Sequence, residues 1–222
     1  YHGTHDAVSV SVRVDPKSAG DARHPDRVPE YPNMPSQVVE SVVVLPFNDV
    51  EASRELLLKH AEDLACVIVE PVMGGSGMIP ALPEYLQMLR DVTRQIGALL
   101  IFDEVISLRV APGGAQQHYG ITPDMTAMGK IIGGGLPVGA FGGKREIMEL
   151  YDPTKGPKLN HAGTFQGNPM TMVAGIAAME NLTPQVYRHL DSLAERLKQG
   201  VRAICDEMDV PVQVTVELGR TR

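Results

Sequence analysis

The chain has 222 residues, of which 43% are apolar and 21% charged, so it can bury the core of one large domain or two small ones. Its net charge of −7 argues against a general nucleic-acid surface, which carries a basic excess. No stretch reaches the ~18 apolar residues of a membrane-spanning helix. The two cysteines lie in apolar contexts without a CxxC pair, so we expect reduced thiols, as in a cytoplasmic protein. Together with the charge and the absence of a long apolar run, we expect a protein that binds neither membrane nor nucleic acid.

The first sixty residues contain both patterned and irregular segments. Residues 8–14 place valine at every second position, which is the period of a half-buried strand. The proline-rich residues 15–37 are predicted to cross the surface without regular structure. The β-branched run at 38–45 predicts a second strand, and we expect a helix over 50–63.

The middle of the chain has the pattern of a βαβ unit. Two short runs, 64–70 and 98–103, are almost continuously apolar, which is typical of parallel strands that are covered on both faces. Between them, Pro83 and Gly97 mark the start and the end of a helix with one apolar face. Because such crossovers are right-handed, we predict an α/β fold with a mainly parallel sheet flanked by helices.

The remaining part of the chain predicts three strands and three helices. We expect strands at 124–128, 138–141 and 210–216, and helices at 144–151, 168–181 and 184–208. The apolar stripe of the last helix is interpreted as a packing face. A single final strand cannot bury its apolar face alone, so we expect the chain to be incomplete at its C-terminus. The start at Tyr1, without Met, suggests the same for the N-terminus.

Two adjacent carboxylates, Asp103 and Glu104, follow the second buried run. Open α/β sheets bind their ligands at the carboxyl ends of the strands. An apolar strand that ends in Asp-Glu also resembles the magnesium-binding strand of P-loop nucleotidases. The chain has no phosphate loop of the required pattern, so we set that interpretation aside. A solvated acid at a strand end, without a function, remains an alternative.

Lys130 lies 27 residues after Asp103, between Gly129 and an apolar, glycine-rich stretch that continues to Ala140. Desolvation lowers the pKa of an ammonium group and makes the amine available for Schiff-base chemistry. A lysine considered by itself is most often a surface residue. Together with Asp103 it fits what pyridoxal phosphate (PLP) requires, which is an amine for attachment and an acid for the pyridine nitrogen.

Five landmarks follow the order and the rough spacing of the class III (ω-type) PLP-dependent aminotransferases. They are Tyr1-His2-Gly3, Glu70-Pro71, Asp103-Glu104-Val105, Lys130 in its glycine-rich segment, and Gly163-Thr164. The chain therefore resembles this family over nearly its whole length. The resemblance implies the large domain of the fold-type I PLP-dependent transferases, with PLP as cofactor and an amino acid and a keto acid as substrates.

The resemblance also implies roles for residues around the cofactor. Lys130 would hold PLP as a Schiff base and move a proton during catalysis, and Asp103 would pair with the pyridinium nitrogen. Tyr1 would stack on one face of the cofactor ring, and Val105 would pack on the other face.

Three further residues are implied at the rim of the site. His2, in the Tyr-His-Gly motif, is expected among the cofactor-binding residues, and Glu70 is expected to form hydrogen bonds near the cofactor. Thr164 resembles the threonine that reaches the PLP phosphate of the neighbouring subunit. The resemblance therefore implies a homodimer with shared active sites.

Two branches of the family resemble the chain most. The stretch GKIIGGGLPVGAFGG is similar to glutamate-1-semialdehyde aminomutases and to β-amino-acid (β-phenylalanine type) aminotransferases alike. The segment DEVISLRVAPGG, which contains Arg109, is one residue shorter than the typical aminomutase form and resembles the β-amino-acid branch more. We expect an aminotransferase, with a 2,1-aminomutase and a non-catalytic truncated homologue as the alternatives.

Residues 1–208 are expected to form the PLP-binding large domain, incomplete at its N-terminus, and residues 209–222 the start of a truncated small domain. The family's phosphate-binding turn and substrate arginines would then lie outside the chain. His2, His5 and Asp6 have the chemistry of zinc ligands. We expect no metal, because no further ligand is apparent and the Tyr-His-Gly motif accounts for His2.

Overall fold

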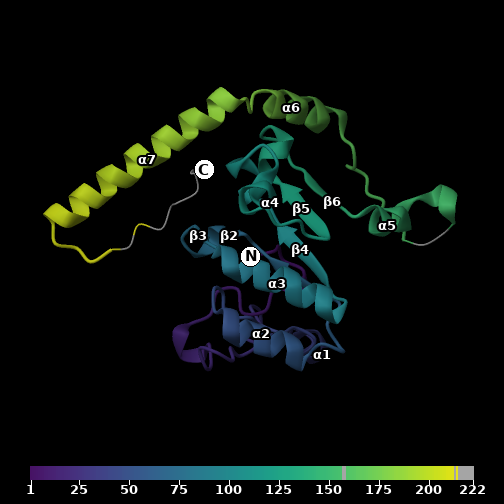
Figure 1. Cartoon of the computed structure of the whole chain (residues 1–222). Helices are drawn as coiled ribbons and strands as arrows, with labels where there is room; N and C mark the ends of the chain where they lie inside the picture. The colour runs from purple at the N-terminus through teal and green to yellow at the C-terminus, as the bar shows by residue number, and fades with distance from the viewer. Residues whose placement is uncertain (157–158, 213, 215–222) are drawn as a thin grey trace.

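The computed structural model describes residues 1–156, 159–212 and 214, and a four-stranded sheet lies at its centre (Figure 1). The strands, in spatial order, are β1 (Cys66–Val69), β4 (Leu99–Asp103), β5 (Met125–Gly129) and β6 (Gly139–Gly143). β1, β4 and β5 are parallel to one another, whereas β6 runs antiparallel to β5. The predicted α/β fold with a mainly parallel sheet is therefore confirmed.

The strands are joined and flanked by helices. These are α1 (Ser36–Glu40), α2 (Val50–Lys59), α3 (Pro83–Ile96), α4 (Gly114–Tyr119), α5 (Arg145–Met148), α6 (Pro169–Glu180) and α7 (Pro184–Glu207). The helices predicted within 50–63, 144–151, 168–181 and 184–208 are confirmed, with small differences at their ends. The sequence did not predict α4 or the hairpin of β2 (Val72–Met73) with β3 (Ile79–Pro80).

The helix of the βαβ unit forms as its punctuation predicts. Pro83 occupies the first position of α3, where a missing N–H costs no hydrogen bond, and Gly97 ends the helix with a φ of 76°. The buried core lies between α3, α2 and one face of the sheet. Its members include Leu57, Tyr85, Leu86, Met88, Leu89, Val92, Leu100 and Phe102.

The opposite face of the sheet is less covered than the sequence predicts. Residues of β1 and β4 that point away from α3 remain accessible, since Cys66 is exposed and Ile68 and Ile101 are only half-buried. The apolar runs at 64–70 and 98–103 therefore predicted the strands correctly. Among the described residues, helices bury only one of the two faces completely.

Two predicted strands near the N-terminus are wrong. Within 8–14 only Val10 forms a bridge, to Pro29, because Ser11 takes a φ of 55° and the proline-rich segment offers no continuous partner. At 38–45, the first residues belong to α1 and the rest form no strand. In both segments the valine pattern was misleading, because β propensity is decided by packing against a neighbouring strand.

The last two helices do not cover a face of the sheet, and Figure 1 shows the long α7 extending away from it after α6. Within α7 no residue is buried, and Leu197 and Ile204 of its apolar stripe are 70% and 57% exposed. The stripe is therefore not covered by the described residues, contrary to the packing prediction. The strand predicted at 210–216 lies partly outside the described residues, and its described part is not a strand. None of the described helices is both long enough and apolar enough to cross a membrane.

Candidate active site

The ends of three parallel strands bring the predicted cofactor residues to one edge of the sheet. Glu70 directly follows β1, Asp103 ends β4, and Lys130 directly follows β5. β4 lies between β1 and β5, and Asp103 pairs in register with Ala127 of β5. An acid, a second acid and a lysine thus follow three adjacent strands at their carboxyl ends, where open α/β sheets bind ligands.

Asp103 is a buried carboxylate with one hydrogen bond to each oxygen. Oδ2 lies 2.8 Å from Nδ1 of His2, and Oδ1 accepts the backbone N–H of Val105 at 3.0 Å. Burial raises the pKa of Asp103, but the hydrogen bond from His2, the hydrogen bond from Val105 and the charge of His2 outweigh it, so the pKa lies below its ordinary value. Asp103 is therefore ionised at neutral pH.

Glu70 ties the Tyr-His-Gly segment to the hairpin that follows β1. Its Oε1 forms an ion pair with the α-amino group of Tyr1, the first residue of the chain, and its Oε2 accepts from the backbone N–H of Gly74 at 3.1 Å. A Cβ placed on Gly75 would lie 3.9 Å from the Tyr1 Cβ, and the Tyr1 side chain is half exposed. Two strand-end carboxylates thus hold two successive residues, since Glu70 holds Tyr1 and Asp103 holds His2.

Lys130 begins the short 3-10 helix η5 (Lys130–Gly133) in a backbone conformation that is uncommon for a lysine. Its φ is +48°, in the left-handed region, and the preceding Gly129 is fully extended. The side chain is exposed, and its amine forms no hydrogen bond or ion pair with any described residue. An exposed amine without a partner at a strand end is available for covalent attachment of a ligand.

Val105 reaches the strand end that carries Lys130. A Cβ placed on Gly129 would lie 3.4 Å from Cγ1 of Val105, so the valine packs directly on the backbone beside the lysine. Tyr1, His2, Glu70, Asp103, Val105 and Lys130 are therefore gathered at one edge of the sheet.

Helix α6 packs closely against the loop that carries Lys130. The sequence did not single out the glycines that allow this contact. A Cβ on Gly175 would lie 2.3 Å from the carbonyl oxygen of Ile132, and a Cβ on Gly134 would lie 2.2 Å from that of Ala174. Only glycine allows such backbone approach, and the φ of +57° at Gly134 also favours glycine. The one signal available in the sequence was a glycine inside a predicted helix.

Thr164 does not join the other predicted residues. It lies on the turn that precedes α6, its side chain is exposed, and it makes no hydrogen bond with any described residue. The neighbouring Phe165 is 81% exposed. Within this chain, Thr164 therefore makes no polar contact with the cluster around Lys130.

Glu104 has a structural role that its neighbour Asp103 does not share. It is fully buried, and its oxygens accept the backbone N–H groups of Ala115 and Gln116 at the start of α4. Gly114, with a φ of +73°, passes so close to this carboxylate that a Cβ would collide with it. The carboxylate satisfies helix N–H groups that otherwise have no partner.

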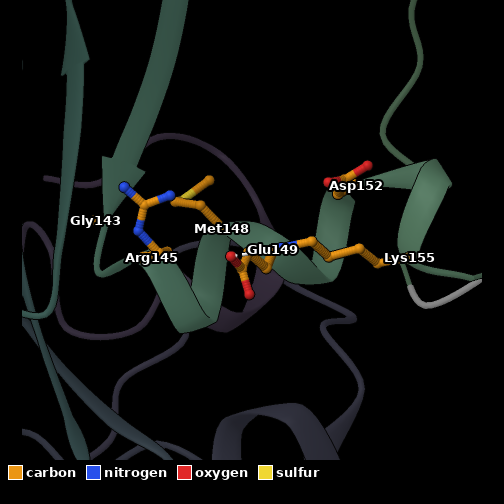
Figure 2. Close-up of a pocket in the computed structure, with 6 residues that line it drawn as sticks. All are labelled: Gly143, Arg145, Met148, Glu149, Asp152 and Lys155. Carbon is orange, nitrogen blue, oxygen red and sulfur yellow. Dashed lines mark ion pairs between the residues drawn. The ribbon is translucent and has the colours of Figure 1, made fainter.

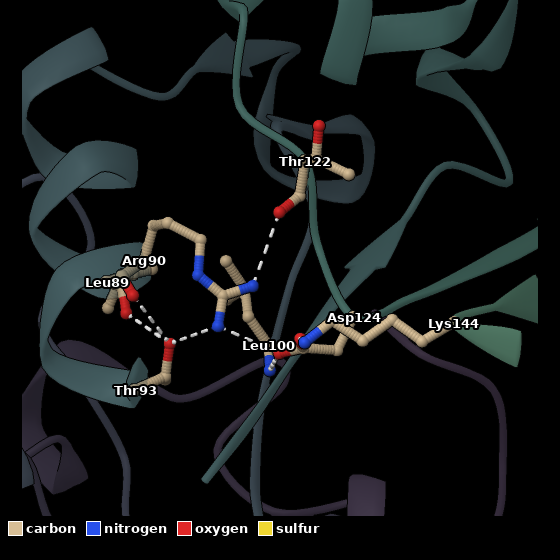
Figure 3. Close-up of polar contacts among 7 residues, drawn as sticks. All are labelled: Leu89, Arg90, Thr93, Leu100, Thr122, Asp124 and Lys144. Atoms are coloured by element: carbon tan, nitrogen blue, oxygen red, sulfur yellow. Dashed lines mark hydrogen bonds and ion pairs between the residues drawn. The ribbon is translucent and has the colours of Figure 1, made fainter. Parts of the chain in front are cut away.

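Another buried acid, Asp124, lies at the other edge of the sheet, and Figure 3 shows its polar contacts. Asp124 directly precedes β5 and forms ion pairs with Arg90 at 2.8 Å and Lys144 at 2.7 Å. It also accepts the backbone N–H of Leu100 at 2.7 Å. Burial raises the pKa of Asp124, but these donors outweigh it and lower the pKa to about 2.

Figure 2 shows the pocket of about 390 Å³ that adjoins α5. It is a shallow depression lined by Gly143, Arg145, Met148, Glu149, Asp152 and Lys155. Gly143 pairs with Met125 at the amino end of β5, whereas Gly139 pairs with Gly129 beside Lys130. The depression therefore lies by the opposite edge of the sheet and does not belong to the candidate active site.

The donor set at the carboxyl edge fits PLP. Lys130 offers a free amine, and the Asp103 oxygens retain lone pairs, because a carboxylate has about four acceptor positions and two are used. A lysine and an ionised acid on neighbouring strand ends are the groups that PLP requires for attachment and for its pyridine nitrogen. The α/β fold and this set of groups are those expected of the PLP-dependent transferases of fold-type I.

Within this class, the chain belongs to the class-III aminotransferases, since that family matches residues 1–219. Enzymes of this family depend on PLP. The chain is 46% identical over 96% of its length to a glutamate-1-semialdehyde 2,1-aminomutase from Sulfurihydrogenibium azorense, of which it covers 48%. It thus spans about half the length of the curated relatives that it matches.

Two solved structures are similar to the chain. An omega-transaminase from Sphaerobacter thermophilus is 47% identical, with a TM-score of 0.93 over 99% of this chain and 50% of that protein. A β-phenylalanine aminotransferase from Variovorax paradoxus is 45% identical, with a TM-score of 0.71 over 74% of this chain and 38% of that protein.

Proposed function

We propose that the protein carrying this chain transfers an amino group from an amino acid to a keto acid, with PLP held on Lys130. The observation that carries the proposal is the free amine of Lys130 and the ionised Asp103 on the adjacent strands β5 and β4. When bound, PLP supplies an electron sink for the carbon that bears the substrate amine.

The residues of this chain have distinct tasks in the proposed reaction. Lys130 holds the cofactor through Nζ and then moves a proton at the substrate carbon. Asp103 keeps a proton on the pyridine nitrogen, because an ionised carboxylate stabilises a positive charge beside it. Val105, packed against Gly129, supports one face of the ring, and Tyr1 supports the other.

A β-amino acid is the proposed substrate class. Two observations support it. The segment between Val105 and Gly113 has the shorter form with Arg109 that resembles the β-amino-acid branch. In addition, the chain is 45% identical to the β-phenylalanine aminotransferase over their shared part.

A 2,1-aminomutase is the second candidate, and the aminomutase from Sulfurihydrogenibium azorense favours it at 46% identity. The two candidates differ in one requirement. A transaminase needs a separate amino acceptor, whereas an aminomutase moves the amine within one substrate.

The proposed assembly is a homodimer with shared sites. Helix α6 is apolar all round, yet it buries only Thr171 and Gly175 against the described residues, while Met170 and Val173 are 72% and 69% exposed. A helix of this kind is normally covered on every side. Thr164, on the exposed turn before α6, would then reach the cofactor of the partner subunit.

Mixing two impaired variants tests the shared site. Lys130→Ala and Thr164→Ala dimers are each expected to be impaired, and subunit exchange should restore activity in hybrid dimers. One site of each hybrid then combines an intact lysine with an intact threonine. A mixture that stays inactive, although mass spectrometry shows hybrids, would contradict the sharing.

The reaction itself is tested with the full-length protein, PLP, a β-amino acid and a keto acid acceptor. We expect the aminated acceptor to form at the rate at which the β-amino acid disappears. Glutamate-1-semialdehyde without any acceptor serves as the aminomutase arm. Product in that arm alone would replace the transaminase proposal with the second candidate, and no product in either arm would contradict both.

A further inference from the structure

Three aromatic rings meet beside β6, and one of them comes from the segment that leads to Thr164. Phe141 lies on β6, Tyr151 ends the 3-10 helix η6 (Glu149–Tyr151), and His161 belongs to the loop before α6. The ring centroids of His161 lie 5.1 Å from Phe141 and 5.9 Å from Tyr151, and those of Phe141 and Tyr151 lie 5.3 Å apart. Each ring therefore contacts the other two, in the tilted and edge-on arrangements that aromatic pairs prefer.

A backbone hydrogen bond holds the same stretch of chain. The N–H of Leu159 donates to the carbonyl oxygen of Leu150 at 2.9 Å, directly before the two residues whose rings meet. The His161 side chain is exposed on its outer side. Among the described residues 160–167, it is nevertheless the one side chain that makes a ring contact, hydrogen bond or ion pair. His161 therefore attaches the beginning of the loop to the rest of the chain.

Helix α6 fixes the other end of the loop. The side chain of Asn168 caps the helix, since its Oδ1 accepts the backbone N–H of Met170 at 3.0 Å. The helix in turn packs on η5 through Gly175. The side chains at 162–167, between the two anchors, are exposed. Thr164 thus lies on a short loop that is fixed at both ends and faces solvent in the middle.

We propose that His161 is a positioning residue for Thr164: its imidazole, held against Phe141 and Tyr151, fixes the loop so that Thr164 meets the phosphate of the PLP in the partner subunit. This inference rests on the proposed homodimer with shared sites, and His161 acts in it through Thr164 without touching the cofactor. The physical basis is conformational entropy. A loop that is already ordered loses little freedom when it binds phosphate, whereas a loop released at one end must be ordered at that moment.

The test compares PLP with pyridoxal, which can form the same bond to Lys130 but lacks the phosphate. Each is titrated into the full-length protein and followed by absorbance. His161→Ala should weaken PLP affinity about two- to tenfold, the worth of an aromatic contact, and leave pyridoxal affinity unchanged. His161→Phe keeps a ring against Phe141 and Tyr151, so it should retain the affinity of the wild type for PLP. Equal losses for both ligands, or a loss for neither, would overturn the inference.

Two further variants assign a failure to its cause. His24→Ala is the matched control, because His24 is exposed on the proline-rich segment, and it should change neither affinity. Thr164→Ala should weaken PLP but not pyridoxal, and adding His161→Ala to it should cost little more, because both act on one contact. Unchanged PLP affinity in Thr164→Ala would contradict the shared site and the inference with it. A loss in Thr164→Ala without one in His161→Ala would contradict the inference alone.

Hybrid dimers supply a result that a folding defect would not produce. In a hybrid with one Lys130→Ala subunit, the remaining lysine is served by the loop of that altered subunit. His161→Ala should therefore lower the activity of the hybrid when it lies on the Lys130→Ala subunit. On the subunit with the intact lysine it should have no effect. Equal impairment from both placements would contradict positioning across the subunit boundary.

Discussion

Asp103 at the carboxyl end of β4 and Asp124 at the amino end of β5 are both buried, and the pKa of each lies below its ordinary value. Their partners differ. Asp124 is surrounded by two cationic side chains and a backbone N–H, and it joins α3 to β4 and the start of α5. Asp103 has one histidine and one backbone N–H.

The comparison separates a structural acid from an acid that can serve a ligand. A carboxylate neutralised by two cations, as Asp124 is, has its charge fully used within the protein. A carboxylate that is held by one donor on each oxygen keeps both its charge and its acceptor positions for an incoming cation. On the proposed function, the amino edge of the sheet stabilises the fold and the carboxyl edge binds the cofactor.

The largest effect is expected at the carboxyl edge. Lys130→Ala should remove the cofactor attachment and the proton transfer, and the loss of the proton transfer alone is worth about 10²–10⁴-fold in kcat. Because the side chain is exposed, thermal stability without PLP should change little. Steady-state kinetics and thermal unfolding check both parts. A variant that keeps its activity would remove Lys130 from the mechanism.

The next largest effect is expected at the amino edge. Asp124→Ala leaves the buried Arg90 without its counter-ion, which should cost about 3–5 kcal/mol in the free energy of unfolding. Lys144→Ala is the matched control, because its side chain is 52% exposed and its loss should cost less than about 1 kcal/mol. Urea unfolding measures the free energy of unfolding of both variants. Equal losses would contradict the assignment of Asp124 as a structural acid.

The pH dependence of the free energy of unfolding should follow the protonation of the Asp124 carboxylate. Its pKa is lowered in the folded state from an ordinary 3.8 to about 2, so its ionised form stabilises the fold above the unfolded pKa. This contribution, about 2 kcal/mol, should be lost as the pH falls from about 5 to 2. The unfolding free energies of the wild type and Asp124→Asn should converge over that range, and a constant difference would refute the assignment.

The smallest effect concerns the helix that holds the lysine loop. Gly175→Ala places a Cβ 2.3 Å from the Ile132 carbonyl oxygen, and we expect it to cost about 1–3 kcal/mol and to weaken PLP attachment. Gly200→Ala in α7 is the control, since a Cβ there meets nothing within 4 Å. Similar PLP affinities of the two variants, measured by titration, would show that α6 does not position Lys130.

Local patterns predicted the parts of the fold that local physics determines. Pro83 and Gly97 delimit α3 because each residue has a backbone preference that fits its end of a helix. The short apolar runs predicted β1 and β4 because buried parallel strands need such runs. The valines at 8–14 failed, since a strand also needs a partner, and proline supplies no N–H for one.

Most residues that meet at the carboxyl edge could be named from the sequence, but their contacts could not, and Thr164 does not join them. Asp103 and Glu104 look equivalent in the sequence, and only the fold turns one toward His2 and the other toward α4. The close contact between α6 and the Lys130 loop depends on the absence of a Cβ at Gly175. Gly175 lies beside Ile132 in space, although the two residues are distant in the chain. Such contacts are set by tertiary packing, which no local pattern records.

The most direct test of the central claim is to add PLP to the purified full-length protein, reduce it with borohydride and map the modified peptide by mass spectrometry. The account predicts a pyridoxyl group on Lys130, and none on Lys144, whose amine is paired with Asp124. Attachment to another lysine, or none at all under conditions in which the protein is folded, would contradict the account.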